Sequence, residues 1–253
     1  MPATQPSFTP SLAQLRTIAS PVTDYRVLPF GIDAIDRRLG GAGLRAGALH
    51  EATARSPSLV DDAAATLFLA GIAARATGST GGPVLWASCR FDLYAPGLAQ
   101  AGLPSASVIH AQPRDDAALL AVIEDAVRDG TPSAIVAEAS KVSMVATRRL
   151  QLVAAEADIP VLLLRRRRSL NEDPLAEPSA AWTRWRIGTA SSERLDVAGV
   201  GRGRWLVELA RQRGGESFSL IVEGSDETGR LAVPAGLGHR AAETVGTARF
   251  AAA

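Results

Sequence analysis

The sequence predicts an α/β domain with a mainly parallel central sheet flanked by helices, extended by a C-terminal antiparallel hairpin. Two observations lead to this class. Between about residue 28 and residue 180, short continuous apolar runs alternate with longer helical segments, as expected for strands that helices cover on both faces. Beyond that point, runs with strand periodicity flank Gly214 and Gly215, which favour a tight turn. The β–α alternation places most strands parallel.

The expected elements follow in chain order. Buried strands are expected at residues 48–51, 83–87, 134–137 and 159–164. Between and beside them, helices are expected at residues 61–76, 94–101, 115–129 and 142–157. The later strands are expected at residues 182–188, 204–213 and 218–223.

The chain divides into an arm, a core and a tail. Residues 1–27 form an N-terminal arm with a short helix at residues 11–20, for which an oligomerisation arm and a simple surface helix are equally good interpretations. Residues 28–225 form the core. Residues 226–253 are poor in large apolar residues and are expected to be a flexible tail.

Composition excludes several classes of protein. The chain has 253 residues, is 47% hydrophobic and 21% charged, and has a net charge of +1, so it can form a core and is no polycationic coat protein. One cysteine and three scattered histidines do not provide a zinc cluster or a disulfide framework, so no metal is expected. No apolar stretch is long enough for a membrane span. We therefore expect a cytoplasmic protein without a membrane partner.

The near-neutral total conceals a basic middle section. Residues 161–213 carry eleven arginines and six acidic residues. Arg165, Arg166, Arg167 and Arg168 directly follow the strand expected at residues 159–164, at the edge where open α/β sheets place their ligands. Guanidinium groups grip phosphates, so contact with DNA or an acidic partner is one interpretation. The alternative is a solvated loop whose arginines pair with Glu172, Asp173 and Glu177.

Tryptophan and arginine alternate in the next expected strand. Trp182, Arg184 and Arg186 share one face, opposite to Trp185. Aromatic rings interleaved with arginine form a stacking platform in proteins that bind single strands. Tryptophans at strand spacing are more often core residues, however, and Trp205 is expected in the core.

The opening of the core resembles that of the RecA-like ATPases. Residues 28–51, LPFGIDAIDRRLGGAGLRAGALHE, resemble the glycine-rich run that leads into the first core strand of that family, with Gly31, Asp33, Gly47 and Glu51 at the expected spacing. The resemblance implies a RecA-like core. In such ATPases the strand continues into the Walker A loop, GxxxxGK followed by Ser or Thr, whose amides and lysine bind phosphates.

The corresponding loop is degenerate in this chain. Residues 52–62, ATARSPSLVDD, contain neither glycine nor lysine, and two carboxylates stand where phosphates would approach. Glu138 stands at the position of the Walker B aspartate. We therefore expect no cofactor, no nucleotide hydrolysis and no enzyme. The residues of the degenerate loop are Ala52, Arg55, Ser56, Asp61 and Asp62.

A core of this kind, with an eroded nucleotide site, closely resembles the ImuA family. The resemblance covers roughly residues 28–223, including RWLVELARQRGGESFSLIVE at residues 204–223. It implies a damage-inducible accessory protein that works with ImuB and, indirectly, an error-prone C-family DNA polymerase in translesion synthesis. It further implies RecA as a partner, with single-stranded DNA and a second copy of the chain as additional candidates.

The RecA resemblance also bears on the basic residues. The strand at residues 159–164 leads, in RecA, into a loop that binds single-stranded DNA. Arg211 and Arg213 stand where RecA-like proteins carry a basic pair that reaches across a protomer boundary, so a subunit contact and a solvated pair are both open. Two other functions stay open as alternatives: an active RecA- or KaiC-like NTPase, and a SulA-like cell-division inhibitor.

Overall fold

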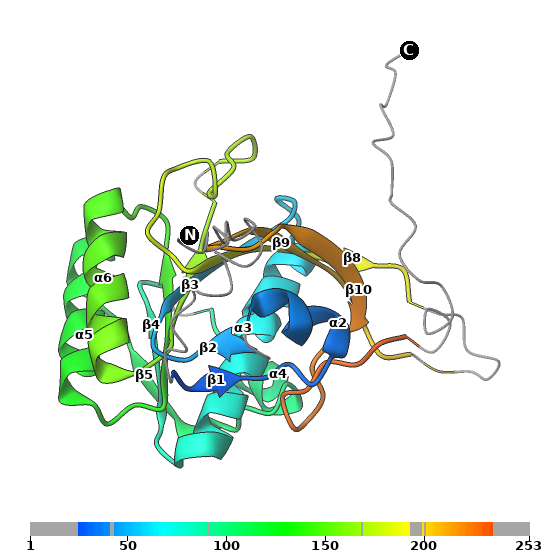
Figure 1. The fold of residues 1–253 in the computed structure, drawn as a ribbon, viewed down its shortest axis with the longest axis horizontal. Helices are drawn as coiled ribbons and strands as arrows, with labels where there is room; N and C mark the ends of the chain where they lie inside the picture. The colour runs from blue at the N-terminus through cyan, green and yellow to red at the C-terminus, as the bar shows by residue number, and fades with distance from the viewer. Residues whose placement is uncertain are drawn as a thin grey trace, which may run out of the picture.

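An eight-stranded mixed sheet forms the centre of the protein (Figure 1). The computed structural model describes residues 25–40, 43–90, 92–167, 169–192, 199 and 201–234. The strands lie in the order β10-β9-β8-β3-β7-β6-β4-β5. Their bounds are β3 Leu49–Ala54, β4 Val84–Ser88, β5 Val108–Ala111, β6 Ala134–Ala139, β7 Val161–Arg165, β8 Thr183–Ala190, β9 Arg204–Gln212 and β10 Phe218–Glu223.

The sheet is parallel from β5 to β8 and antiparallel from β8 to β10. This confirms the expected fold class, with the antiparallel hairpin at its C-terminal end. In the register, Glu51 of β3 pairs with Leu163 of β7 on one side and with Arg184 of β8 on the other. β5 was not expected, because its four residues are exposed or only half-buried and do not form an apolar run.

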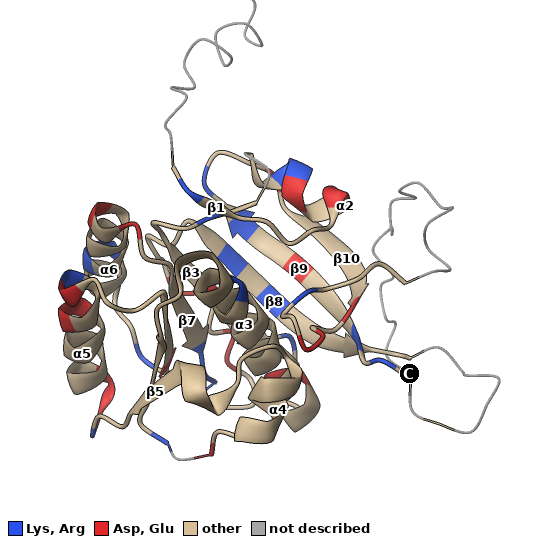
Figure 2. Ribbon diagram, turned by 90° about the horizontal axis from the view of Figure 1, so that it is seen from below, with Lys and Arg blue, Asp and Glu red and all other residues tan. Residues whose placement is uncertain are grey.

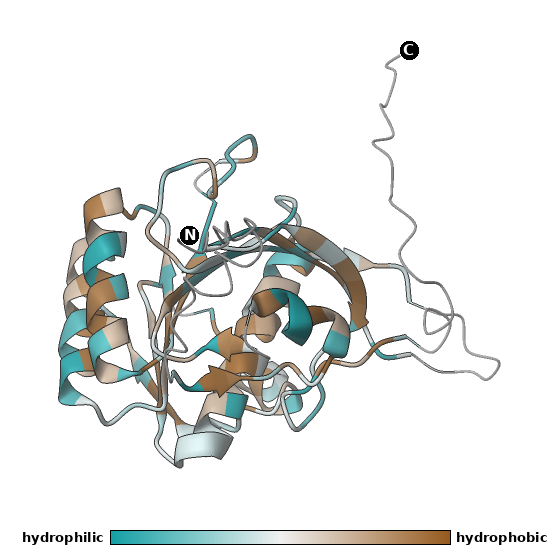
Figure 3. Cartoon of the chain, in the orientation of Figure 1, coloured by the Kyte–Doolittle hydropathy of each residue, from teal (hydrophilic) through white to brown (hydrophobic). Residues whose placement is uncertain are grey.

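Helices cover both faces of the sheet. α3 (Leu59–Thr80) packs on one face, whereas α5 (Asp116–Asp129) and α6 (Met144–Ala157) pack on the other. Figure 3 shows apolar residues gathered along the sheet, with hydrophilic residues on the outer turns of α5 and α6. The smaller elements are β1 (Val27–Leu28), α2 (Asp33–Asp36), η1 (Arg37–Leu39), β2 (Leu44–Arg45), α4 (Ala95–Gln100) and η2 (Ser105–Ser107).

The central helix α3 is longer than the sequence predicted. The Ser58 hydroxyl accepts a hydrogen bond from the Asp61 amide (3.3 Å) and so caps the helix two residues earlier than expected. The helix ends at Gly81, whose φ of 78° is left-handed and available to glycine at little cost. Phe68 of α3 stacks with Phe30 and tilts against Trp185 of β8, with ring centroids 5.9 and 5.6 Å apart. These rings fix the helix against β8.

The packed core continues beyond residue 225, where we expected it to end. Glu223 and Ala232 exchange backbone hydrogen bonds, and the Leu231 side chain is buried in the core. Residues 226–234 therefore belong to the core. The helix expected at residues 11–20 and the remainder of the tail lie outside the described residues. Within the described part, none of the helices has the length and apolarity to cross a membrane.

Candidate functional site

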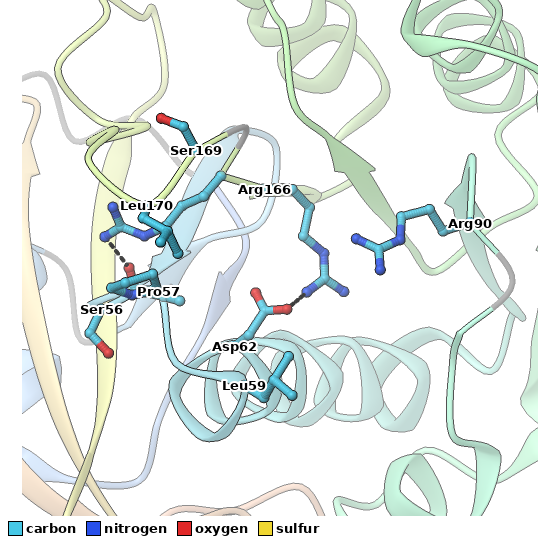
Figure 4. Close-up of a pocket in the computed structure, with 10 residues that line it drawn as sticks. Ser56, Pro57, Leu59, Asp62, Arg90, Arg166, Ser169 and Leu170 are labelled. Carbon is cyan, nitrogen blue, oxygen red and sulfur yellow. Dashed lines mark hydrogen bonds and ion pairs between the residues drawn. The ribbon is translucent and has the colours of Figure 1, made fainter.

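A cavity of about 310 Å³ opens where the carboxyl ends of β3 and β7 meet the amino end of α3 (Figure 4). The loop at residues 55–58 connects β3 directly to α3 and forms one wall of this cavity. This is the position that a Walker A loop occupies between a strand and a helix. The cavity is lined by Ala54, Ser56, Pro57, Leu59, Asp62, Arg90, Arg166, Arg167, Ser169 and Leu170.

Asp61 links Ser56 of the β3–α3 loop to Thr189 of β8 by hydrogen bonds. Its Oδ2 accepts from the Ser56 amide (3.1 Å) and the Ser56 hydroxyl (2.6 Å). Its Oδ1 accepts from the amide (2.7 Å) and the hydroxyl (2.8 Å) of Thr189 in β8. Burial alone raises the pKa of Asp61, but the hydrogen bonds from Ser56 and Thr189 outweigh it and hold the pKa below its ordinary value. The Asp61 carboxylate thus accepts a hydrogen bond from a backbone amide of the loop, as a phosphate does in a nucleotide-binding loop.

Arg166 connects Asp62 of α3 to Glu138, the residue at the Walker B position. Its Nε and Nη2 donate to Glu138 Oε2 at 3.0 and 2.7 Å, and its Nη1 donates to Asp62 Oδ2. Glu138 also accepts from Trp86 Nε1 (2.7 Å). Burial alone lowers the pKa of Arg166, but Glu138 and Asp62 outweigh it and raise this pKa, so the guanidinium stays charged. In Figure 4 Arg166 and Arg90 point into the same side of the cavity.

Arg167 ties down the other wall of the cavity. Its Nη2 donates to the carbonyl oxygens of Ala54 and Arg55, both at 3.0 Å, and its Nη1 donates to the Glu172 carbonyl. The loop therefore directs carbonyl oxygens toward a cation of the chain, which is the opposite of an anion-binding nest of amides.

Glu51 holds two arginines inside the protein. Its Oε1 accepts from Arg165 Nη1 (3.1 Å) and the Ser179 hydroxyl (2.8 Å), and its Oε2 accepts from Arg184 Nε (2.6 Å). Arg165 is 1% exposed and Arg184 is 5% exposed. The expectation that these two arginines contribute to an exposed DNA or partner surface is therefore wrong. They neutralise a carboxylate that the sheet buries, and Arg165 also pairs with Glu177 (3.1 Å).

Arg186 also forms ion pairs with carboxylates. Its Nη2 pairs with Asp173 (2.7 Å) and its Nη1 with Glu208 (2.9 Å), which also pairs with Arg55 (3.4 Å). Of the alternative interpretation, a solvated loop whose arginines pair with Glu172, Asp173 and Glu177, the structure shows the Arg165–Glu177 pair, but Arg165 is buried rather than solvated. Arg168 lies outside the described residues.

Trp182 lies away from the cavity, at the amino end of β8. Its ring is half-buried and lies 4.6 Å from the Arg45 guanidinium and 5.4 Å from that of Arg213. The exposed Arg211 donates to the Ser179 carbonyl (2.8 Å). Trp205 and Trp185 are buried in the core, as a strand with tryptophan on its inner face predicts.

Most of the predicted site residues fall into three groups, and Arg55 and Arg186 lie apart from them, where both pair with Glu208. Asp61, Asp62, Glu138, Arg166 and Arg167 meet at the cavity with Ser56; Arg165 and Arg184 lie inside the sheet layer; Trp182, Arg211 and Arg213 lie at the opposite end of β8. Sequence reasoning missed the partner of Trp182, because nothing in the sequence relates Arg45 to it. It also missed the role of Glu51, although a glutamate in a strand covered on both faces signals a buried cation.

The fold and the cavity define the class of this protein: it is a RecA-like α/β domain in which the side chains of the nucleotide position pair with one another. The crystal structure of the RadB recombinase aligns with a TM-score of 0.56 at 16% identity, covering 82% of this chain and 99% of that one. At this identity the likeness shows the fold alone.

Sequence relatives narrow the class to one family. Two curated proteins, both named Protein ImuA, come from the Caulobacter vibrioides strains NA1000 / CB15N and ATCC 19089 / CIP 103742 / CB 15. Each is 37% identical to this chain over 209 residues, which is 81% of this chain and 86% of the relative. The chain therefore belongs to the ImuA family. No protein-family model matches it.

Proposed function

We propose that this protein is a non-catalytic accessory protein of damage-induced, error-prone translesion synthesis. Its partners are ImuB and RecA, through which it serves an error-prone C-family DNA polymerase. Membership of the ImuA family supports the setting. One observation carries the non-catalytic part: the Arg166 guanidinium bridges Glu138 and Asp62, at the position where an ATPase of this fold holds magnesium and phosphates.

Nucleotide binding would have to break several internal interactions at once. A phosphate at the β3–α3 loop competes with Asp61 for the Ser56 amide and approaches the carboxylate of Asp62. Magnesium at Glu138 competes with Arg166, which already donates to this carboxylate. The loop offers no glycine to reshape it and no lysine to neutralise the phosphates.

The mouth of the cavity has the character of a protein-binding surface. Leu59, Tyr94 and Leu170 are 85%, 71% and 75% exposed. Leu59 and Leu170 line the cavity, and Leu59 and Tyr94 line an adjoining hollow of about 230 Å³ between α3 and α4. Large apolar side chains gathered at one exposed place favour a protein partner. We therefore assign this surface to the contact with ImuB or RecA.

The first test is calorimetry with ATP and magnesium, with RecA as the positive control. We expect no binding and no hydrolysis. Measurable hydrolysis that falls on substitution of Asp62 or Glu138 would establish the NTPase alternative and refute the proposal.

The second test is capture of purified ImuB and RecA by variants of the surface leucines. We expect L59D and L170D to lose capture. The matched control is L152D on α6, because Leu152 is also exposed, at 63%, but lies on the opposite face of the sheet. Capture of neither partner, or equal loss in all three variants, would count against the assignment, and capture of a cell-division protein instead would favour the SulA-like alternative.

A further inference from the structure

Two aromatic rings and two guanidinium groups alternate at the amino end of β8. Arg45 lies between the rings of Tyr25 and Trp182, at 4.8 and 4.6 Å from their centroids, and Arg213 covers the Trp182 ring at 5.4 Å. The Arg213 amide also donates to the Trp182 carbonyl (2.9 Å), which holds β9 against this ring. We name these four residues, Tyr25, Arg45, Trp182 and Arg213, the Trp182 stack.

The cations around the stack lack acidic partners. Arg38, Arg45, Arg211 and Arg213 form no ion pair with a carboxylate in the part of the chain that the structure describes. By contrast, each described arginine at the cavity is held by a carboxylate or by backbone carbonyls. Figure 2 shows basic residues near β1, on this side of the molecule; the two basic residues within β8, Arg184 and Arg186, are already paired with carboxylates. Cations without a carboxylate partner among the described residues therefore gather around the stack.

The chemistry of the stack fits one class of ligand. Flat guanidinium and indole groups receive bases by stacking, with little dependence on sequence, and unpaired arginines bind phosphates between the bases. Acidic peptides use the charge but have no need of the planar surfaces. We propose that the Trp182 stack, together with Arg211, binds single-stranded nucleic acid.

This location differs from the loop that follows β7. Trp182 lies at the amino end of β8, where its amide bonds the Leu49 carbonyl, whereas the cavity lies at the carboxyl ends of β3 and β7. Beside Arg38 a hollow of about 340 Å³ contains Glu216, whose carboxylate repels phosphates. The bound single-stranded nucleic acid therefore passes over Trp182 and Arg213 rather than into this hollow.

The test is fluorescence anisotropy of a labelled oligothymidylate across a salt series. Two exposed cations are removed in the R211A/R213A variant, which carries little folding risk. We expect its plot of log affinity against log salt to be shallower by about 1.4, since each phosphate contact of a single strand contributes about 0.7. W182A should weaken binding roughly tenfold or more at fixed salt, from the loss of base stacking, with its slope unchanged.

Two controls test whether the effects of these variants are specific to the Trp182 stack. R114A removes another exposed arginine, which follows β5 at the other edge of the sheet, and its affinity and slope should match the wild type. Tryptophan fluorescence gives a second signal, because Trp86, Trp185 and Trp205 are buried and only Trp182 among the four is half-buried. Oligothymidylate should quench the wild-type emission, and W182F should abolish the quenching while circular dichroism confirms the fold.

Three outcomes would overturn the inference. These are no binding by the wild type, equal weakening in R114A, and binding that poly-glutamate displaces equally well in W182A and wild type, which identifies an acidic-protein surface. The inference takes its biological setting from the proposed function, but the assay contains neither ImuB nor RecA. Failure of the wild type to capture ImuB and RecA, with intact oligonucleotide binding, would refute the proposed function. Capture of these partners without oligonucleotide binding would refute the inference.

Discussion

Replacing Glu51 by glutamine should be one of the most destabilising isosteric changes in this protein. The side chain is 0% exposed and accepts from Arg165, Arg184 and Ser179. The E51Q variant keeps the volume of the side chain and removes its charge. Arg184 then loses its carboxylate and keeps a hydrogen bond from its Nη1 to the Leu175 carbonyl (2.9 Å).

The magnitude follows from the burial of the cations. Removing one partner of a buried ion pair costs about 3–5 kcal/mol, because an uncompensated charge stays inside. Arg165 retains Glu177, which is half-exposed, so the cost concentrates on Arg184 and lies toward about 3 kcal/mol. Domains of this size lose roughly 2–4 °C per kcal/mol, so the melting temperature should fall by roughly 6–12 °C.

The assay is urea unfolding followed by circular dichroism, supported by calorimetric melting. E177Q makes the same chemical change in the same cluster, but its side chain is 43% exposed, and it should cost no more than about 1 kcal/mol. The third variant replaces Glu51, Arg165 and Arg184 together by methionine. It should be more stable than E51Q, because no buried charge of the cluster is left without a partner and Glu177, which loses Arg165, is partly exposed to water.

Equal destabilisation by E51Q and E177Q would refute this reasoning. It would mean that water reaches the cluster and that the two arginines are screened despite their burial. A triple variant less stable than E51Q would refute it in another way, by showing that the buried arginines left without Glu51 are not the source of the destabilisation.

Three further predictions concern pH, packing and the cavity. Burial lowers the pKa of His50 to about 4, so its stabilising contribution is complete above the unfolded value of 6.5 and is lost as the pH falls toward 4. The wild type should therefore lose about 3 kcal/mol over this range in urea titrations, and H50Q should show a flatter profile. G102A should destabilise the fold by more than about 1 kcal/mol, because Gly102 has a φ of 87° and an added Cβ would collide with the backbone of Gly229. G130A should cost only about 1 kcal/mol, because Gly130 has a φ of 80° but open space around it. Thermal melts of the two variants compare these costs. R166A should still fail to bind ATP in calorimetry, because the loop keeps its two aspartates and gains no lysine, and measurable affinity would show that Arg166 alone blocks the site.

The sequence predicted the architecture well where burial is uniform. The apolar runs at β6 and β7 are covered on both faces, and such strands are visible as continuous runs. β5 was not predicted because it lies at the sheet edge, where two of its four residues are exposed. The segment around Leu231 escaped because its packing depends on glycine contacts between distant parts of the chain, at Gly71 and Gly229, which leave no periodic pattern.

The candidate site was predictable as a place but not as a set of contacts. The loop noted for its missing glycine and lysine lies between β3 and α3, and Asp61 and Arg167 occupy polar groups along it. The adjacent arginines were interpreted as one patch, yet Arg165 turns to Glu51 while Arg166 turns to Glu138, because neighbouring residues at the end of a strand point to opposite faces of the sheet. The pairing of Trp182 with Arg45 depends on three-dimensional register, which one sequence does not contain.

Arg166 is a cation beside Glu138 that, unlike a bound metal ion, is covalently part of the chain and cannot dissociate. In nucleotide-driven switches the lifetime of a conformation is set by ligand exchange and hydrolysis. A guanidinium attached to the chain has a fixed and very high effective concentration beside Glu138, whatever the energy charge of the cell. In the non-catalytic function that we propose, ligand exchange at this position does not set the lifetime of a conformation. The amount of active protein is then set by its rates of synthesis and removal.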